Sequence, residues 1–190
     1  AAVEGDSFLQ VQVARGPLTG IIRTKLVGSY NLPNVLAAIT VGWHFGVPAN
    51  KIKSAIEAYE PTNSRSQLIR RGNNTIVLDA YNANPSSMRL AIENFAKMPG
   101  CNKVLILGGM MELGVDTEKE HRDLLNLLKQ FSWKAVILVG ESFCILNPEY
   151  PCFLYADEAA EYMRSNPLEN AQVLIKGSRS TQMEKVLEVF

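Results

Sequence analysis

After residue 65, short apolar runs alternate regularly with longer amphipathic stretches, and this alternation constrains the fold more than any other feature of the sequence. Apolar runs of this length are typical of strands buried on both faces, and stretches with a helical period fit helices that cover such strands. The alternation predicts an α/β fold, with a Rossmann-like, mainly parallel sheet and helices on both faces. The expected elements are strands 66–70 and 75–79, helix 85–97, strand 103–107, helix 118–131, strand 135–139, strand 153–155, helix 157–164, strand 173–176 and helix 181–190.

The residues before this region follow a different pattern. Residues 8–14 alternate apolar and polar side chains, and residues 20–27 form a second strand-like run, so a hairpin is expected. Helices are expected at 31–45 and 49–59. The first of these helices is predicted to have one apolar face, made of Leu32, Val35, Leu36, Ile39 and Trp43.

A hairpin and two helices are little material for an independent fold. We therefore interpret the first sixty residues as the tail end of a larger domain.

Composition excludes several classes of function. Apolar residues make up 47% of the chain, which excludes predominant disorder, and 19 basic residues balance 19 acidic ones, which argues against general nucleic-acid binding. No apolar run approaches the roughly 20 residues that span a bilayer, and the first residues lack the pattern of a signal peptide. The three cysteines, Cys101, Cys144 and Cys152, are too few and too scattered to predict a disulfide framework or a zinc site. A structural role for all three and a reducing cytoplasm are expected.

Unusual polar and glycine residues follow three of the predicted strands, at 79–84, 108–112 and 176–179. Ligands of open α/β sheets bind outside the carboxyl ends of the strands, so these segments mark the expected site. A carboxylate such as Asp79 can accept both hydroxyls of a ribose. Asn84 before Pro85 fits equally a helix N-cap and a ligand.

The segment Lys176-Gly177-Ser178-Arg179 combines two cations, a hydroxyl and a predicted helix start. Such a group can receive a carboxylate or a phosphate, although solvated cations at a capped helix start would look the same. It is not a P-loop, because the order Gly-Lys-Ser/Thr is missing. His121 shares a helical face with leucines, which favours a hydrogen-bonded core residue over a catalyst.

Four stretches together resemble the Mur ligases: GSYNLPNVLAA (28–38), LDAYNANPSSM (78–88), LGGMMELG (107–114) and LIKGSRSTQME (174–184). Their order and spacing are similar to the last third of that family over nearly the whole chain. Two positions depart from the family pattern, since Tyr30 stands where histidine is usual and Gly109 where aspartate is usual.

The resemblance implies part of an ATP-dependent amide ligase of peptidoglycan synthesis. Its closest branch phosphorylates a UDP-N-acetylmuramoyl-tripeptide with ATP and Mg²⁺ and joins the activated carboxylate to D-alanyl-D-alanine. Mur ligases carry their P-loop and metal ligands in the central domain, and no such loop occurs here. The resemblance implies that residues 1–60 are the end of that central domain and that residues 61–190 are the C-terminal domain. The resemblance therefore implies an inactive fragment without catalytic or metal residues, from a cytoplasmic and monomeric enzyme that binds no nucleic acid.

The resemblance also implies roles for individual residues. Asn34 would contact adenine, with Asn31 at the helix start beside it, Arg65 would reach the phosphates, Asp79 would bind ribose and Tyr81 would line the nucleotide. The candidates for the incoming amino substrate are Asn82, Asn84, Lys176, Ser178 and Arg179. For Ser178 and Arg179 this assignment rests on chemistry, since a serine and an arginine suit the carboxylate of the dipeptide.

Three alternatives stay open at this point. A ligase similar to folylpolyglutamate synthase shares the architecture but fits the MELG and KGSR segments less well. A nicotinamide-dependent oxidoreductase should show G-x-G-x-x-G after its first strand, and the sequence has none. A non-catalytic nucleotide- or peptide-binding module is the third alternative.

Overall fold

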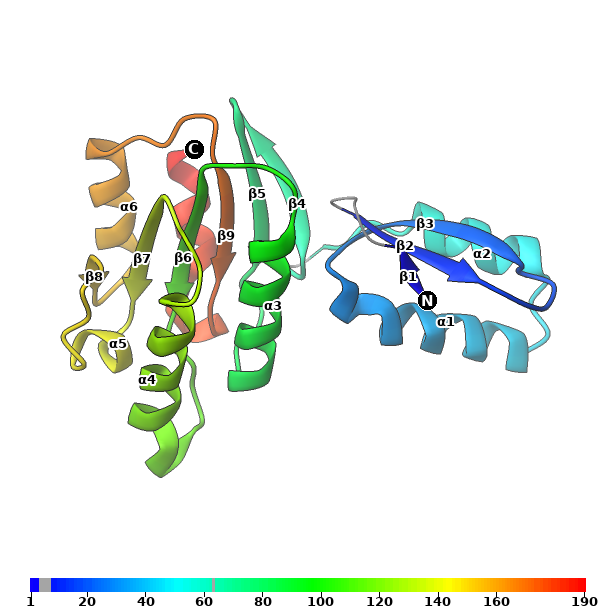
Figure 1. Cartoon of the computed structure of the whole chain (residues 1–190), viewed down its shortest axis with the longest axis horizontal. Coiled ribbons are helices and arrows are strands. Elements are labelled where there is room, and N and C mark those ends of the chain that lie inside the picture. The colour runs from blue at the N-terminus through cyan, green and yellow to red at the C-terminus, as the bar shows by residue number, and fades with distance from the viewer. Residues whose placement is uncertain (4–7, 63) are drawn as a thin grey trace.

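The computed structural model describes residues 1–3, 8–62 and 64–190, which form two parts joined by one connection (Figure 1). The first part holds a three-stranded antiparallel sheet with the predicted hairpin. Its elements are β1 (Ala2–Val3), β2 (Phe8–Val13), β3 (Gly20–Val27), the 3-10 turn η1 (Ser29–Asn31), α1 (Leu32–His44) and α2 (Ala49–Ala58).

The second part is a six-stranded sheet in the order β4-β5-β9-β6-β7-β8. Only the pairing of β4 with β5 is antiparallel, so the predicted α/β class with a mainly parallel sheet is confirmed. Its strands are β4 (Gln67–Arg71), β5 (Asn74–Asp79), β6 (Lys103–Gly108), β7 (Ala135–Val139), β8 (Cys152–Phe153) and β9 (Gln172–Lys176). Its helices are α3 (Pro85–Lys97), the 3-10 turn η2 (Gly114–Asp116), α4 (Thr117–Leu128), α5 (Glu141–Cys144) and α6 (Ala156–Ser165).

Alternate side chains of the central strands enter two separate cores. Leu105 and Leu107 of β6 pack with α3, α4 and α5 on one face, whereas Val104 and Ile106 pack with α6 and the C-terminal segment on the other. All four side chains are fully buried. Helices therefore cover both faces, and the carboxyl ends of the parallel strands remain available for a site (Figure 1).

The C-terminal segment differs from the predicted α-helix at 181–190. It forms two 3-10 helices, η3 (Arg179–Thr181) and η4 (Met183–Val189), because Gln182 between them adopts a left-handed backbone with φ of 49°. Met183 and Val186 are both fully buried, three residues apart. That spacing suits a helix with three residues per turn, so packing selects the tighter helix here.

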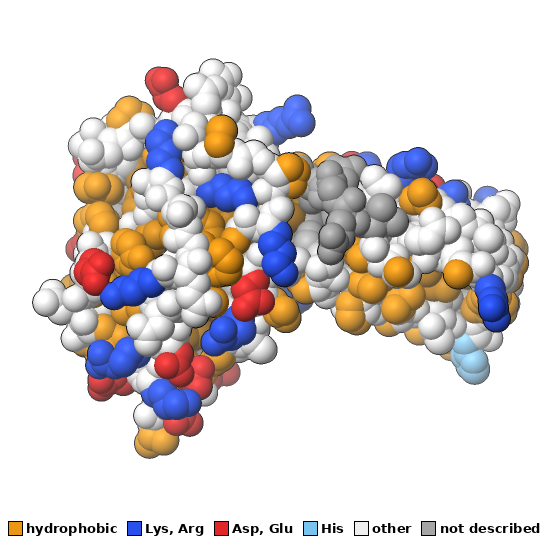
Figure 2. All heavy atoms as spheres, viewed as in Figure 1, with side chains coloured by type: hydrophobic (Ala, Val, Ile, Leu, Met, Phe, Trp, Pro, Cys, Tyr) orange, Lys and Arg blue, Asp and Glu red, His pale blue; other side chains and the backbone are white. Residues whose placement is uncertain are grey.

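The predicted apolar face of α1 is buried only in part. Val35 is buried against the sheet, but Leu36 is 46% exposed and Trp43 is 53% exposed. Apolar side chains accordingly stand at the surface of the first part where α1 lies (Figure 2). On the second part, Figure 2 shows basic and acidic side chains interspersed, as the balanced composition requires.

Cys144 and Cys152 form a disulfide, contrary to the expectation that no cysteine pairs. Cys144 ends α5 and Cys152 begins β8, and the short connection turns back so that their Cα atoms lie 5.6 Å apart. The pairing arises from this turn at the sheet edge, which cysteine spacing alone does not show. Cys101 is free and exposed.

In the portion of the chain that the structure describes, every helix is too short or too polar to cross a membrane.

Candidate functional site

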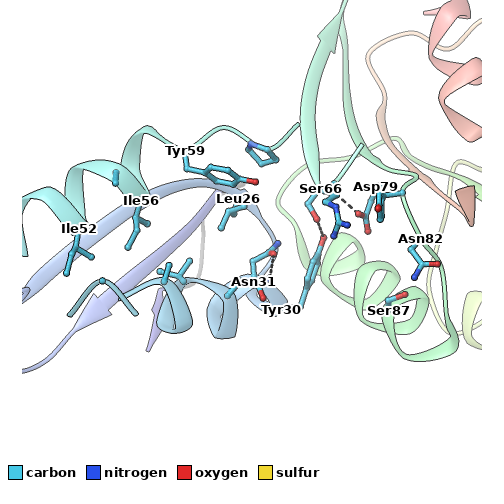
Figure 3. Close-up of a pocket in the computed structure, with 18 of the residues that line it drawn as sticks. Leu26, Tyr30, Asn31, Ile52, Ile56, Tyr59, Ser66, Asp79, Asn82 and Ser87 are labelled. Atoms are coloured by element: carbon cyan, nitrogen blue, oxygen red, sulfur yellow. Dashed lines mark hydrogen bonds between the residues drawn. The ribbon is translucent and has the colours of Figure 1, made fainter. Parts of the chain in front are cut away.

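A pocket of about 840 Å³ lies where the two parts of the chain meet (Figure 3). Its floor between α1 and α2 is apolar and includes Val35, Ile52 and Ile56, while its other end reaches the carboxyl edge of β5. Eight of the ten residues that the sequence places in the site line it: Asn31, Asn34, Arg65, Asp79, Tyr81, Asn82, Asn84 and Lys176. Pockets of this size and mixed lining commonly hold nucleotides and other small molecules.

Asp79 and Lys176 form a buried ion pair at the end of the pocket. They are register partners on the neighbouring strands β5 and β9, and Lys176 Nζ lies 2.6 Å from Asp79 Oδ2. The lysine side chain is 2% exposed and the aspartate side chain 16%. Ser66 donates its backbone N–H to Asp79 Oδ1 at 3.1 Å, so each carboxylate oxygen has one partner and keeps a lone pair for a ligand hydroxyl.

Two of the three N–H donors of the Lys176 ammonium group are used inside the protein. Its ammonium group also donates to the backbone carbonyl of Asn82 at 3.2 Å. A lysine that neutralises a carboxylate and ties down the following loop is a poor receptor for a further anion. The geometry therefore gives Lys176 a positioning role toward Asp79 and Asn82.

The backbone is constrained on both sides of Arg65. Ser64 and Ser66 both have left-handed φ values, of 57° and 48°, which serine seldom adopts. Ser66 is fixed by Asp79 and by Tyr30, whose hydroxyl lies 2.8 Å from Ser66 Oγ (Figure 3). Burial, with the charge of Asp79 as a second cause, raises the pKa of Tyr30 to about 12, so this phenol stays protonated.

Asn31 and Asn34 lie at the start of α1, and they differ in which side-chain amide atoms remain available to a ligand. Asn31 donates to the carbonyl of Val27 at 2.8 Å and accepts from the Asn34 amide at 3.0 Å. Asn31 therefore organises the turn into α1. Asn34 retains its amide oxygen and one amide hydrogen, which match the donor and acceptor pattern of a base edge.

Asn84 caps α3, as one of its two interpretations predicted. Its side-chain oxygen accepts from the backbone N–H of Ser87 at 2.8 Å, and Ser87 Oγ accepts from the Asn84 backbone N–H. The side-chain oxygen of Asn82 accepts from the N–H of Ala83. Ligand roles for these two amide groups stay predictions.

Ser178 and Arg179 do not line the pocket. Ser178 is 3% exposed, and its hydroxyl lies 2.8 Å from that of Ser180. The Arg179 guanidinium is directed to Tyr81, which does line the pocket, and its carbon lies 5.5 Å from the ring centroid. The Arg65 guanidinium carbon lies 3.7 Å from the same centroid.

His121 is a buried, hydrogen-bonded core residue, as expected. Its Nδ1 lies 2.7 Å from the Thr117 carbonyl and must donate to it, while Nε2 accepts from the Met110 N–H at 3.0 Å. This arrangement fixes the neutral imidazole and anchors the loop after β6. Burial lowers the pKa of His121, and the Thr117 hydrogen bond and the charge of Glu120 oppose that shift.

The lowered pKa of His121 predicts a pH-dependent stability. The unfolded chain binds a proton near pH 6.5, whereas the folded chain resists it. The free energy of unfolding should therefore fall as the pH drops below about 6.5, by at most about 1.4 kcal/mol per pH unit from this group. Denaturant unfolding at several pH values between 5 and 8 measures this pH dependence of the unfolding free energy. His121→Gln should remove this dependence of the unfolding free energy on pH. The matched control His44→Gln changes an exposed histidine and should keep the dependence. If the unfolding free energies of the wild type and His121→Gln change with pH in the same way, the assignment to His121 is contradicted.

Sequence reasoning missed Ser66 and the apolar floor of the pocket. Ser66 acts through its left-handed backbone and its two hydrogen bonds, and no residue pattern signals either. The floor residues on α1 and α2 appear in the sequence as ordinary helix faces. Tyr30 was visible only as a departure from the family pattern.

The described residues contain no group of three histidine, cysteine, aspartate or glutamate side chains that could hold a metal ion.

Comparison with known proteins assigns the family. Residues 64–179 match the family described as the glutamate ligase domain of Mur ligases. The chain belongs to the Mur ligase family. The matched segment includes the β5 and β9 ends of the site, and thus Arg65, Asp79 and Lys176.

Curated relatives of this Mur ligase chain share one name. The UDP-N-acetylmuramoyl-tripeptide–D-alanyl-D-alanine ligase of Treponema pallidum is 33% identical over 174 residues, and that of Escherichia coli is 33% identical over 171 residues. Each alignment covers 87% of this chain and 38% of the relative. The chain therefore spans well under half the length of these relatives.

Solved structures agree with the family. MurF from Acinetobacter baumannii matches with a TM-score of 0.80 and 26% identity, over 95% of this chain and 41% of that one. MurF from Thermotoga maritima, solved in complex with ADP, matches with a TM-score of 0.77 over 100% of this chain and 44% of that one. At 21% identity the second match shows the fold alone, as does folylpolyglutamate synthase from Mycobacterium tuberculosis, with a TM-score of 0.61 and 18% identity.

Proposed function

We propose that this chain is the C-terminal part of an ATP-dependent amide ligase that adds D-alanyl-D-alanine to a UDP-N-acetylmuramoyl-tripeptide in peptidoglycan synthesis. The observation that carries the proposal is the pocket between the two parts, which combines an apolar floor with Asn34, Arg65 and the partnered carboxylate of Asp79. The relatives at 33% identity bear the name of this activity.

In this proposal, residues 1–60 are the end of a central domain and residues 61–190 are the C-terminal domain. We assign the P-loop and the ligands of Mg²⁺ to the remaining part of the protein, since this chain spans 38% of the relatives' length. In this proposal the parent enzyme is a cytoplasmic monomer, and its ATP and UDP-linked substrate are cytoplasmic metabolites.

The residues of this chain bind and orient the nucleotide. Asn34 reads the adenine edge, Asp79 accepts the ribose hydroxyls, and Arg65 reaches the phosphates while Tyr81 lines the pocket. ATP transfers its terminal phosphoryl group to the carboxylate of the tripeptide, and the amine of the dipeptide then displaces phosphate to form the amide. Holding the two reactants in line and screening the phosphoryl charge supply most of the catalysis in such a reaction.

The acceptor dipeptide is proposed to bind along the carboxyl edge of the sheet. The residues assigned to this side are Asn82, Asn84, Lys176, Ser178 and Arg179. Lys176 contributes by holding the loop at Asn82. Ser178 is anchored at the same edge, because its backbone N–H donates to the carbonyl of Gly109 at 3.2 Å.

An activity assay tests the proposal. The 190-residue chain should release no phosphate with UDP-linked tripeptide, D-alanyl-D-alanine, ATP and Mg²⁺, because it lacks a P-loop, whereas the full-length protein should turn over. Omission of the dipeptide is the control for uncoupled ATP hydrolysis. Turnover by the chain alone would refute the assignment of the phosphate site to the missing part, and an inactive full-length protein would refute the function.

A nucleotide-binding module without catalysis is the second candidate for this chain by itself. The nucleoside end of the pocket is complete within the described residues, because it needs only Asn34, Asp79 and the apolar floor. Binding of adenosine to the 190-residue chain, measured by calorimetry, would support this candidate.

A further inference from the structure

Two guanidinium groups gather at the ring of Tyr81. The Arg65 and Arg179 guanidinium carbons lie 3.7 and 5.5 Å from its centroid. The three residues come from different places in the sequence: Arg65 precedes β4, Tyr81 follows β5 and Arg179 follows β9. The fold therefore brings two cations to one aromatic ring at the carboxyl edge of the sheet.

Among the described residues, no acidic side chain compensates the charges of these two arginines, because none forms an ion pair with Arg65 or Arg179. The nearby carboxylate of Asp79 is neutralised by Lys176. An aromatic ring attracts cations through its face but carries no net charge, so it leaves both positive charges available to an anion.

Doubly charged oxyanions suit this arrangement better than a carboxylate does. Guanidinium groups donate paired hydrogen bonds to phosphate oxygens, and two of them match the charge of a phosphoryl group. A dipeptide carboxylate carries one charge and would leave the other arginine unpaired. Arg65 also belongs to the pocket lining, which ties the pair to the nucleotide.

We propose that Arg65 and Arg179 form a single receptor for a phosphoryl-type oxyanion and that Tyr81 is the residue that positions both guanidinium groups. The inference rests on the proposed nucleotide pocket and moves Arg179 from the dipeptide carboxylate to the phosphate. Tyr81 then has a second role besides lining the nucleotide pocket, because its ring positions both guanidinium groups.

Binding measurements on the full-length protein test this inference. The variants are Arg179→Met, Tyr81→Leu and Tyr81→Phe, and the probes are adenosine and a non-hydrolysable ATP analogue with Mg²⁺. Arg179→Met should weaken binding of the ATP analogue about tenfold or more and leave adenosine binding unchanged, since only a phosphate contact is lost. Tyr81→Leu should weaken binding of the ATP analogue by more than it weakens adenosine binding, because its ring both lines the pocket and positions the guanidinium groups. Tyr81→Phe keeps the ring and should bind both probes as the wild type does.

A double variant of Arg179 and Tyr81 and a control variant complete the test. The effect of Arg179→Met should shrink in the Tyr81→Leu background, because the ring then no longer holds Arg179. The control is Arg164→Met, which removes an arginine paired with Glu161 on α6 and should change neither affinity.

Opposite results would overturn the inference. If Arg179→Met raises the Michaelis constant for D-alanyl-D-alanine and leaves the ATP analogue unaffected, Arg179 binds the carboxylate. Equal losses for adenosine and the analogue would indicate a structural role only. If the wild-type protein binds no ATP analogue, the proposed function fails together with this inference, whereas normal wild-type binding with an unaffected Arg179→Met variant refutes the inference alone.

Discussion

Replacement of Asp79 by asparagine is expected to lower the free energy of unfolding of this chain by about 3–5 kcal/mol, because it leaves the Lys176 ammonium buried without its counter-charge. Lys176 is 2% exposed, so water cannot replace the lost carboxylate. The asparagine oxygen can still accept from Ser66, which confines the change to the charge. Urea unfolding of the wild type and the variant measures the difference.

The double variant Asp79→Asn/Lys176→Met separates the two roles of Asp79. It removes both charges, so it should recover most of the lost stability. In the full-length protein it should still raise the Michaelis constant for ATP tenfold to roughly a hundredfold, since a charge-assisted hydrogen bond to ribose is gone. A double variant as unstable as the single one would contradict the ion-pair argument, and an unchanged ATP constant would remove Asp79 from the ribose site.

Gly177→Ala is expected to destabilise the chain by about 1–3 kcal/mol and to displace the loop that carries Ser178 and Arg179. A Cβ atom on Gly177 would lie 2.9 Å from the Gly108 Cα and 2.7 Å from Met183 Cγ. The ends of β6 and β9 approach each other too closely there for any side chain. Denaturant unfolding gives the stability, and ligase turnover of the full-length protein reports the position of the loop.

Gly109→Ala is the matched control for Gly177→Ala. Gly109 lies at the same sheet edge, but its nearest neighbour to an added Cβ is His121 Nε2 at 3.5 Å, an ordinary contact. This variant should unfold like the wild type. If the two alanine variants are equally stable, the loop after β9 can shift without a loss of unfolding free energy, and the packing argument is contradicted.

Much of the fold was predictable because it follows from local periodicity. The helix at 85–97 and the strand at 135–139 have the bounds that the sequence pattern predicts, and most other elements agree within a few residues. The C-terminal helix was wrong because burial of Met183 and Val186 and a left-handed Gln182 decide its geometry. Those are tertiary effects that a pattern of apolar residues does not contain.

The sequence predicts where the candidate site lies on the sheet, but it does not predict which side chains of the site contact each other. Asp79, Asn82 and Lys176 were expected at the carboxyl edge because each follows or ends a strand. That Lys176 neutralises Asp79 depends on β9 lying directly beside β5, and strand order cannot be read from strand spacing. The gathering of Arg179 at Tyr81 depends on the same neighbour relation.

The central place of β9 has a consequence for how this protein is made on the ribosome. β9 follows every other described strand along the chain, yet it pairs with β5 on one side and with β6 on the other. Until residues 172–176 leave the exit tunnel, the nascent chain carries two half-sheets with unpaired edges. We therefore expect chaperones that shield strand edges to bind the nascent chain until residues 172–176 have emerged.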